Sequence, residues 1–365
     1  MAAEGERVLS IQSHVVFGYV GGKAAVFPLQ CLGYDVDVVN TVNFSNHSGY
    51  GRSGGTKTSA SELNAIFESM EHNELLMPTR LLTGYIPGAE ALSAVSQLAK
   101  KLKHAKPSLI YLLDPVMGDA GRLYVAPDVV PVYQEMLPLA TVITPNWFEV
   151  ELLTRIKLKD LVSLQRALKI LHEEYYVPNV VISSIPLKSW LLDSLPDAIK
   201  PSSDSENLLC ISSSTTPISS PSSSISMTTP LSSSTSTIHA QCVPTLPGYF
   251  SGVGDLFSAL ILAHFLPHST PANPQCTPLS AAASQALTKT HALLQATHDY
   301  AMTLPEEERL PTDDELDAAN PLRKTRRMRG RELGLIKGQD IIRGVGIDET
   351  NTRRLQLWDQ FWESS

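Results

Sequence analysis

The feature that most constrains the fold is the regular alternation of short apolar runs with longer helix-like segments across the first half of the chain. The apolar, partly β-branched runs are expected to form strands at 7–11, 35–40, 80–83, 110–113, 141–144 and 179–183. Helical periodicity is expected at 24–32, 61–71, 89–104 and 161–174. Strands joined by helices of this length favour right-handed βαβ crossovers. The sequence therefore predicts an α/β fold with a mostly parallel central sheet and helices on both faces.

The pattern changes after residue 183. Hairpin-like strands are expected near 189–192, 207–211 and 237–243, followed by long helices at 255–265 and 279–302. We interpret the chain as one interrupted domain composed of 1–200, 238–303 and 331–365.

Two segments of unusual composition interrupt this domain. Residues 201–237 are rich in Ser and Thr and cannot bury enough apolar surface to offset the entropy of ordering, so most of this segment is expected to be disordered. Residues 304–330 pass from acidic to basic and are also expected to be disordered. Their basic run is interpreted as a solvated charge run rather than a nuclear-localisation or phosphate patch.

Composition and charge exclude several classes of function. A net charge of −8 over 365 residues gives no reason to expect nucleic acid binding. The four cysteines are widely separated and form no zinc-binding pattern, so they are expected to be reduced thiols. No apolar run resembles a signal peptide or approaches the length of a membrane span. We therefore expect a protein without membrane contact, in the cytoplasm and possibly also in the nucleus.

The segment Gly252-Val253-Gly254-Asp255 is the strongest candidate for a catalytic motif. A glycine turn can bring backbone N–H groups close to a phosphate, and the helix that follows adds the partial positive charge of its N-terminus. An Asp beside such an anion hole can accept the proton of a substrate hydroxyl during phosphoryl transfer. The alternative, an ordinary helix N-cap, is about equally common for a short motif of this kind.

Further acids follow two of the predicted buried strands. The string DPVMGD occupies 114–119 and the string TPNWFE occupies 144–149. In open α/β sheets, ligands bind beyond the carboxyl ends of the strands, where these side chains would converge. Asp119 and Glu149 are the candidate Mg²⁺ ligands, because Mg²⁺ with a nucleotide needs only one or two carboxylates. Capping of a turn and of a helix is the alternative role for the two acids.

Together these motifs resemble the ribokinase-like superfamily of small-molecule kinases, whose fold is a three-layer sandwich. The N-terminal half narrows the resemblance to the pyridoxal kinase family through the strings VLSIQSHV (8–15), GYV (18–20), FPLQ (27–30), NTVNFSNHSGY (40–50) and LTGY (82–85). The resemblance covers about 7–193 and 238–300, with weaker similarity near 331–342. It implies ATP as co-substrate, Mg²⁺ or another divalent cation, a monovalent cation such as K⁺, and a homodimer.

The resemblance also implies a role for individual residues. Asp255 is the implied base, and Gly252, Val253 and Gly254 form the implied anion hole. The implied substrate contacts are Ser13, Val20, Val42, Phe44, His47, Ser48, Tyr85 and Asp255. The implied ATP contacts are Asp114, Asn146, Glu149, Ser183, Ser184 and Val253, with a lid of Leu246, Pro247, Gly248 and Tyr249. The monovalent cation is implied at Asp114 and Thr144.

Residue chemistry agrees with this assignment in the ring pocket. Short hydroxyls such as Ser13 and Ser48 can donate to or accept from a ring nitrogen and a phenolic oxygen. Apolar and aromatic neighbours suit the walls of a small aromatic pocket. His47 is expected either to cover the ring or to serve as a loop histidine bonded to backbone.

Two departures from the family pattern affect the phosphate site. Val253 stands where the family usually has Thr or Ser, so one hydroxyl contact to phosphate is lost while the backbone N–H is kept. The turn after Asp119 is also shortened. Val253 is expected to alter turnover or ATP affinity while the anion hole is kept, and the shortened turn leaves the geometry of the metal loop open.

The expected function is transfer of the γ-phosphate of MgATP to the 5′-hydroxyl of pyridoxal, and also of pyridoxine and pyridoxamine, in vitamin B6 salvage. One alternative is a hydroxymethylpyrimidine kinase of the same superfamily, which the string SNHSGY at 45–50 disfavours. The other is a catalytically silent B6-binding scaffold, which Asp255 disfavours and Val253 keeps open.

Overall fold

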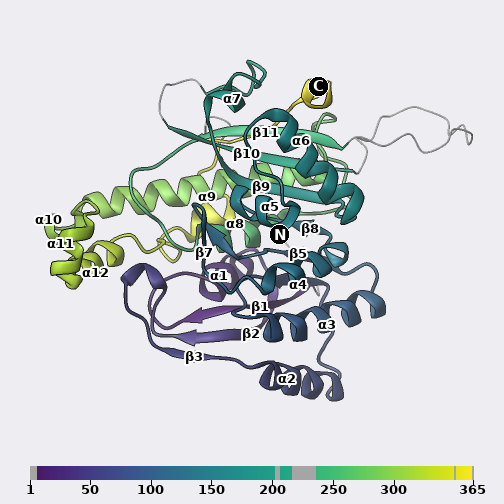
Figure 1. Cartoon of the computed structure of the whole chain (residues 1–365), viewed down its shortest axis with the longest axis horizontal. Helices are drawn as coiled ribbons and strands as arrows, with labels where there is room; N and C mark the ends of the chain where they lie inside the picture. The colour runs from purple at the N-terminus through teal and green to yellow at the C-terminus, as the bar shows by residue number, and fades with distance from the viewer. Residues whose placement is uncertain (1–5, 202–205, 216–235, 349–350, 364–365) are drawn as a thin grey trace, which may run out of the picture.

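The structure, a computed structural model, describes residues 6–201, 206–215, 236–348 and 351–363. Its centre is a ten-stranded sheet with the order β12-β11-β10-β9-β8-β5-β4-β1-β2-β3 (Figure 1). The strands are β1 (Arg7–Val15), β2 (Asp35–Phe44), β3 (Gly55–Lys57), β4 (Arg80–Thr83), β5 (Ile110–Leu113), β8 (Val142–Ile143), β9 (Asn179–Pro186), β10 (Asn207–Ser214), β11 (Thr237–Pro244) and β12 (Gln356–Leu357). A separate small hairpin pairs β6 (Gly118–Asp119) with β7 (Arg122–Leu123).

The direction of pairing divides this sheet. All pairings from β2 through β1, β4, β5 and β8 to β9 are parallel. The strands at the two edges, β3 on one side and β10 to β12 on the other, join antiparallel. The predicted parallel sheet is therefore confirmed, with antiparallel additions at its edges.

Helices cover both faces of the sheet. The longer helices are α1 (Gly22–Cys31), α2 (Ala60–His72), α3 (Ala89–Ala105), α4 (Val129–Met136), α5 (Trp147–Thr154), α6 (Leu161–Lys169), α8 (Val253–His264) and α9 (Pro278–Met302). The remaining helical segments are α7 (Ser189–Leu192), α10 (Glu306–Arg309), α11 (Asp314–Ala319), α12 (Pro321–Arg329), α13 (Gln339–Arg343), the 3₁₀ turns η1 (Ser48–Tyr50), η2 (Leu137–Leu139) and η4 (Asp359–Trp362), and the π-helical turn η3 (Ile170–Glu174).

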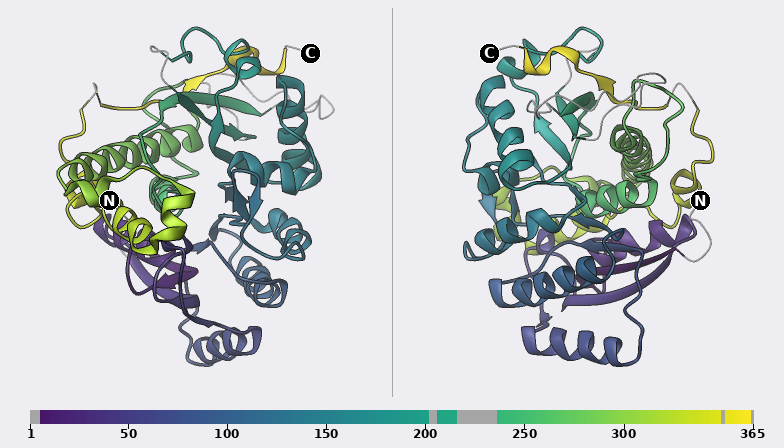
Figure 2. Two further views of the ribbon diagram at one scale, coloured as in Figure 1. Left: turned by 60° about the vertical axis from the view of Figure 1, so that its left-hand side comes forward. Right: turned by 90° about the vertical axis from the view of Figure 1, so that its right-hand side faces the viewer.

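Successive strand residues enter two different cores, because side chains alternate across a sheet. Leu9 and Leu81 belong to the core beneath α2 to α6, whereas their neighbours Val8 and Leu82 belong to the core beneath α1, α8, α9 and α13. In the left view of Figure 2, the green helices α8 and α9 and the blue helices α3 and α4 lie on opposite sides of the sheet. The chain is thus a three-layer α/β sandwich, as expected.

The expected strand near 189–192 is wrong, because this segment forms the helical turn α7. An apolar run of this length does not distinguish a strand from a turn of helix. β9 continues to Pro186 and pairs directly with β10, so α7 lies in the connection between these two strands.

The structure also differs from the expectation of disorder over 304–330, where it places α10, α11 and α12 (Figure 1). Opposite charges from the two ends of this segment meet. Arg323 and Arg327 are buried, and both donate to the carboxylate of Asp317. Hydrogen bonds from Arg327 and Arg323 lower the pKa of Asp317 to about 2. The basic run is therefore paired and not simply solvated, contrary to the sequence-based interpretation.

The boundaries of the Ser-rich segment are narrower than expected. Residues 207–214 form β10, which pairs with β11 from Asn207↔Pro244 to Ser214↔Thr237. Residues 202–205 and 216–235, which include the core of the predicted disordered insertion, lie outside the described residues. Within the described part of the chain, no helix combines the length and apolar character needed to cross a membrane.

Candidate active site

The candidate site residues gather at the carboxyl ends of the parallel strands. Asp114 follows β5, Thr144 follows β8, and Tyr85 follows β4 after one residue. Ser13 lies near the end of β1, beside Val42 of β2 at an irregularity in the pairing between these strands. Irregularities of this kind redirect side chains at strand ends. The expected convergence at this edge of the sheet is what the topology produces.

The predicted anion hole forms the N-terminus of α8. Gly252 is the N-cap residue with a left-handed φ of 80°, and α8 begins at Val253. A Cβ atom at Gly252 would lie 2.0 Å from the carbonyl oxygen of Tyr19, so this close approach requires glycine. The first N–H groups of a helix have no intrahelical acceptor and carry partial positive charge. Gly252, Val253 and Gly254 therefore offer backbone donors to an anion.

Asp255 occupies the first turn of α8 and is not its N-cap. Its Oδ2 accepts a hydrogen bond from the N–H of Gly21 at 2.8 Å. Gly21 in turn lies against Ser13, since a Cβ atom at Gly21 would be 2.1 Å from Ser13 Oγ. Burial raises the pKa of Asp255 to about 6, and the bond from Gly21 opposes this shift. The carboxylate therefore lies between the anion hole and the implied ring pocket, where a base for a substrate hydroxyl is needed.

Asp114 and Thr144 are joined by a residue of α8. Ser258 Oγ donates to Asp114 Oδ2 at 2.9 Å and lies 2.8 Å from Thr144 Oγ1. Burial raises the pKa of Asp114 to about 8, with a further contribution from the negative charge of Asp255. Two buried carboxylates and two hydroxyls form an oxygen-rich environment that a bound cation would stabilise.

Glu149 caps the N-terminus of α5 and also supports a loop. Its Oε2 accepts from the N–H of Asn146 at 2.9 Å, while Oε1 accepts from Met117 N–H at 2.9 Å and from Gly118 N–H at 3.4 Å. Asn146 completes the capping box and donates through Nδ2 to Gly118 O at 2.8 Å. Burial and the charge of Asp114 raise the pKa of Glu149, and the three backbone bonds oppose this shift. The geometry therefore favours the capping alternative for Glu149.

Asp119 lies on the turn that Glu149 supports. The β6–β7 hairpin turns through Ala120 and Gly121, both with positive φ. Asp119 Oδ1 accepts from Ala120 N–H at 2.7 Å. Among the described residues there is no cluster of three His, Cys, Asp or Glu side chains suited to a metal ion. Any Mg²⁺ held here would therefore need oxygen ligands beyond these carboxylates, as nucleotide phosphates and water provide.

The implied ring pocket draws on two further loops. His47 is the N-cap of η1, its Nδ1 accepts from Gly49 N–H at 3.1 Å, and Ser48 follows it. Thr41 Oγ1 donates to the carbonyl oxygen of Tyr85 at 2.7 Å, which fixes the loop after β4. Burial raises the pKa of the Tyr85 phenol. Val42 is buried, whereas Val20 and Phe44 are partly exposed and free to contact a ligand.

The implied nucleotide contacts lie on the other side of Asp114. Ser183 and Ser184 belong to β9 and are partly exposed, and Ser183 N–H donates to Pro145 O at 3.3 Å. The lid residues Leu246, Pro247, Gly248 and Tyr249 follow β11 and precede the anion hole.

Sequence reasoning missed four residues. Ser258 carried a usable signal, because it lies three residues after Asp255 and so shares its helix face. Gly21 was detectable only as part of a glycine pair. Tyr124, whose pKa is raised by burial and then by its interaction with Tyr249, carried no signal of its own. Glu332 also lacked a local signal, because its partners are about three hundred residues away in sequence.

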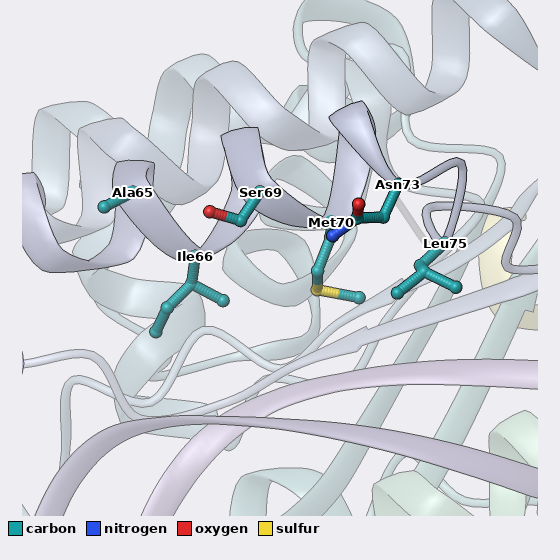
Figure 3. Close-up of a pocket in the computed structure, with 6 residues that line it drawn as sticks. All are labelled: Ala65, Ile66, Ser69, Met70, Asn73 and Leu75. Carbon is teal, nitrogen blue, oxygen red and sulfur yellow. The ribbon is translucent and has the colours of Figure 1, made fainter.

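An apolar surface groove along α2 is separate from these residues. Figure 3 shows its lining, which consists of Ala65, Ile66, Ser69, Met70, Asn73 and Leu75. None of these side chains titrates, and none is a predicted site residue. The groove is not part of the candidate active site.

A carboxylate beside a helix N-terminus, at the carboxyl ends of a parallel sheet with the predicted superfamily motifs, defines the class as a ribokinase-like small-molecule kinase. A family model described as phosphomethylpyrimidine kinase matches residues 42–214. Pyridoxal kinase of Arabidopsis thaliana is 39% identical over 298 residues, covering 80% of this chain and 82% of that protein. Pyridoxal kinase of Homo sapiens is 36% identical over 296 residues, covering 80% and 85%.

Solved structures agree with these relatives. Pyridoxal kinase from Leishmania donovani in complex with ADP and pyridoxamine matches with a TM-score of 0.73 and 29% identity, covering 96% of this chain and 99% of that chain. The chain belongs to the pyridoxal kinase family.

Proposed function

We propose that this protein transfers the γ-phosphoryl group of MgATP to the 5′-hydroxyl of pyridoxal, and also of pyridoxine and pyridoxamine, to supply pyridoxal 5′-phosphate in vitamin B6 salvage. The observation that carries this proposal is the position of Asp255. Its carboxylate lies next to the anion hole and accepts a hydrogen bond from Gly21, which itself lies against Ser13. The complexes of the Leishmania relative with ADP and pyridoxamine support the same pair of substrates.

In this mechanism Asp255 accepts the proton of the 5′-hydroxyl as the hydroxyl oxygen attacks the γ-phosphorus. The bond between the γ-phosphorus and the β–γ bridging oxygen breaks, and ADP leaves. A pKa of about 6 leaves the carboxylate mostly ionised at neutral pH yet more basic than an ordinary Asp. The N–H groups at the start of α8 hold the migrating phosphoryl group. Ser13 and Ser48 orient the pyridine ring, and Val42, Phe44 and Tyr85 provide its apolar surroundings.

The residues present fit two cations. Asp119 would hold Mg²⁺, with Glu149 keeping the β6–β7 turn in place. Asp114 and Thr144, bridged by Ser258, would hold a monovalent cation such as K⁺. The cations, when bound, neutralise charge on the triphosphate. We further propose a homodimer, on the basis of family resemblance, and light scattering tests this point. The proposed location is the cytoplasm, with the nucleus as a second compartment, and cell fractionation tests it.

The test is ATP-dependent formation of pyridoxal 5′-phosphate by the purified protein, with hydroxymethylpyrimidine as a parallel substrate and D255N as the inactive control. Turnover of pyridoxal that depends on Asp255 is the expected result. Preference for hydroxymethylpyrimidine would establish the other kinase activity. Binding of pyridoxal without turnover of either substrate would establish the silent scaffold.

A further inference from the structure

We propose that Glu332, in the segment between α12 and α13, is a positioning residue that fixes the two ring-side loops of the active site. These loops are defined here as 17–22, after β1, and 45–51, after β2. The inference rests on the proposed function, because these loops carry Val20, His47 and Ser48.

Three hydrogen bonds converge on the Glu332 carboxylate. Oε2 accepts from the backbone N–H of Tyr19 at 2.7 Å. Oε1 accepts from the Tyr50 hydroxyl at 2.7 Å and pairs with His47 Nε2 at 3.0 Å. Tyr19 belongs to the first loop, whereas His47 and Tyr50 belong to the second, so one carboxylate joins both. The side chain is only 11% exposed, which makes these contacts costly to lose.

The hydrogen bonds around His47 determine which of its two ring nitrogens carries the proton. Gly49 N–H donates to Nδ1, so Nδ1 carries no proton and the ring is neutral with its proton on Nε2. This proton points to Glu332. On the other side, Nδ1 lies 3.4 Å from Ser251 Oγ, in the residue directly before the anion hole. Glu332 therefore holds His47, which belongs to the second ring-side loop, beside Ser251 in the turn that precedes the anion hole.

Glu332 is ionised in this arrangement. Burial works to raise its pKa, but the hydrogen bonds from His47, Tyr50 and Tyr19 outweigh burial and lower it below the ordinary value. A carboxylate can accept all three bonds, whereas a neutral amide has one acceptor oxygen and cannot. The pKa of the Tyr50 phenol is raised by burial and by its bond to Glu332, so Tyr50 remains the donor to this carboxylate.

The position of Glu332 is set by the ion-paired helices α10 to α12. Helix α12 lies next to η1 of the second loop, and in the left view of Figure 2 the yellow-green helices lie beside the purple N-terminal strands. Arg331, the preceding residue, lies against the lid, because a Cβ atom at Gly248 would be 2.8 Å from its guanidinium carbon. Consecutive residues of one segment thus contact the ring-side loops and the nucleotide lid.

The decisive variant is Glu332→Gln, which keeps the size of the side chain but deprives at least one of the three donors of its acceptor. We expect the KM for pyridoxal to rise on the order of tenfold, the factor that corresponds to about one lost hydrogen bond, while the KM for ATP changes little and the melting temperature falls by at most a few degrees. Glu332→Asp, which retains the acceptors on a shorter side chain, should recover part of this loss. Glu308→Gln is the matched control, because Glu308 pairs with Arg329 in the same helical unit and, among the described residues, no hydrogen bond or ion pair joins its side chain to either loop.

A second readout does not depend on activity. In ¹⁵N NMR spectra of the histidine rings, His47 should show the Nε2-protonated tautomer in the wild type, because Gly49 N–H donates to Nδ1. Its Nε2 resonance should shift in E332Q, where an amide replaces the carboxylate that this nitrogen faces. An unchanged KM for pyridoxal with an unchanged His47 signal would overturn the positioning role. Equal rises in both KM values with a lowered melting temperature would also overturn it, because they indicate general destabilisation. Absence of pyridoxal phosphorylation in the wild type would instead refute the proposed function, and the NMR comparison would still decide the role of Glu332.

Discussion

Asp255 is the residue on which the proposed chemistry depends, and its surroundings separate two roles that the sequence left open. It lies in the first turn of α8 but makes no cap, and it accepts from Gly21 across 234 residues of sequence. Among the described residues, the backbone bond to the Asp255 carboxylate comes from Gly21, which lies against Ser13, and this is the position that the proposed proton transfer requires. The N-cap alternative does not describe this geometry.

Replacing Asp255 by Asn should lower kcat by about a hundredfold or more, the usual range for a lost general base. ATP binding should change little, because the anion hole uses backbone N–H groups. Steady-state kinetics and ATP titration measure both quantities. Asp128→Asn, at an exposed position without a side-chain cap bond, is the matched control. Near-normal turnover in D255N would remove Asp255 from the catalytic step.

The pH profile of kcat/KM should report the same residue. Because the pKa of Asp255 is raised to about 6, the base is protonated and inactive below this pH and becomes active as pH rises through it. We expect kcat/KM for pyridoxal to increase with pH up to about 7 and then to level off. The acidic limb should be absent from the residual activity of D255N. A limb that persists unchanged in this variant would assign the titration to another group.

Glu149 and Asp119 are both acids that follow buried strands, and we expect them to have different roles in the site. Glu149 accepts three backbone bonds and holds the turn, while Asp119 lies on that turn. Glu149→Gln should raise the Mg²⁺ concentration needed for half-maximal activity and also lower the melting temperature, because a buried acceptor is lost. Asp119→Asn should raise the Mg²⁺ requirement alone. Mg²⁺ titrations and thermal melts of both variants decide, and equal effects on stability would contradict this division of roles.

At the scale of elements, helices α10 to α12 show that a charge pattern alone does not distinguish a solvated segment from an ordered, ion-paired one. Alternation of acidic and basic runs is compatible with a solvated segment, but Arg323 and Arg327 are buried against Asp317. Arg326 and Arg329 pair with Glu307 and Glu308 of α10 at 3.1 Å and 2.7 Å. Because these pairs are close in sequence, the unit forms locally and presents its end to the active site.

Asp317→Asn should therefore destabilise the protein, since it leaves two buried guanidinium groups without a charged partner. The melting temperature at neutral pH should fall by a few degrees, and the KM for pyridoxal should rise if Glu332 is displaced. The folded-state pKa of Asp317 is depressed, so its stabilising contribution is present above the ordinary Asp pKa and is lost as pH falls toward about 2. Wild type and D317N should consequently converge in stability at low pH. Glu315→Gln, an exposed acid of the same helix, is the control.

At the scale of the whole molecule, the parallel strands bring the motifs to one edge and the antiparallel strands β10 to β12 extend the sheet beyond it. β10 and β11 pair along their full length, up to Ser214↔Thr237. Within the described residues, the pairing of this hairpin is continuous from Asn207↔Pro244 to Ser214↔Thr237.

Removing residues 216–234 and joining the ends with a short Gly/Ser turn should leave a folded, active kinase with unchanged KM values. The deletion must spare Ser212, Ser213 and Ser214, which are buried in β10. A parallel deletion of 212–234 is the informative comparison, because it cuts the strand and should lower the melting temperature. A fully folded 216–234 deletion without ATP-dependent turnover would show that this segment takes part in the reaction.

The Thr-Pro and Ser-Pro dipeptides at 216, 220 and 229 lie in the same region, outside the described residues. They remain candidates for proline-directed phosphorylation, which would add negative charge to the connection between β10 and β11.

Local patterns in the sequence were enough to predict the three layers, and they singled out 252–255 as the candidate catalytic motif. Helix and strand periodicities located most elements within a few residues, and the rule that ligands bind at the carboxyl ends of parallel strands predicted that Asp114 and Thr144 lie at the same edge of the sheet. These signals are local, because they depend on neighbours within one turn or one pleat.

Which atoms meet depends on packing between segments that lie far apart in the sequence. The bridge of Ser258 between Asp114 and Thr144, the capping bonds of Glu149 and the contact of Glu332 with Tyr19, 313 residues away, depend on how packed elements orient their side chains. In 304–330 the ion pairs of Arg323 and Arg327 with Asp317 are close in sequence, but they too depend on how the helices orient these side chains, which composition does not give. Contacts between distant segments leave no periodicity in the sequence, since each partner reads locally as an ordinary polar residue.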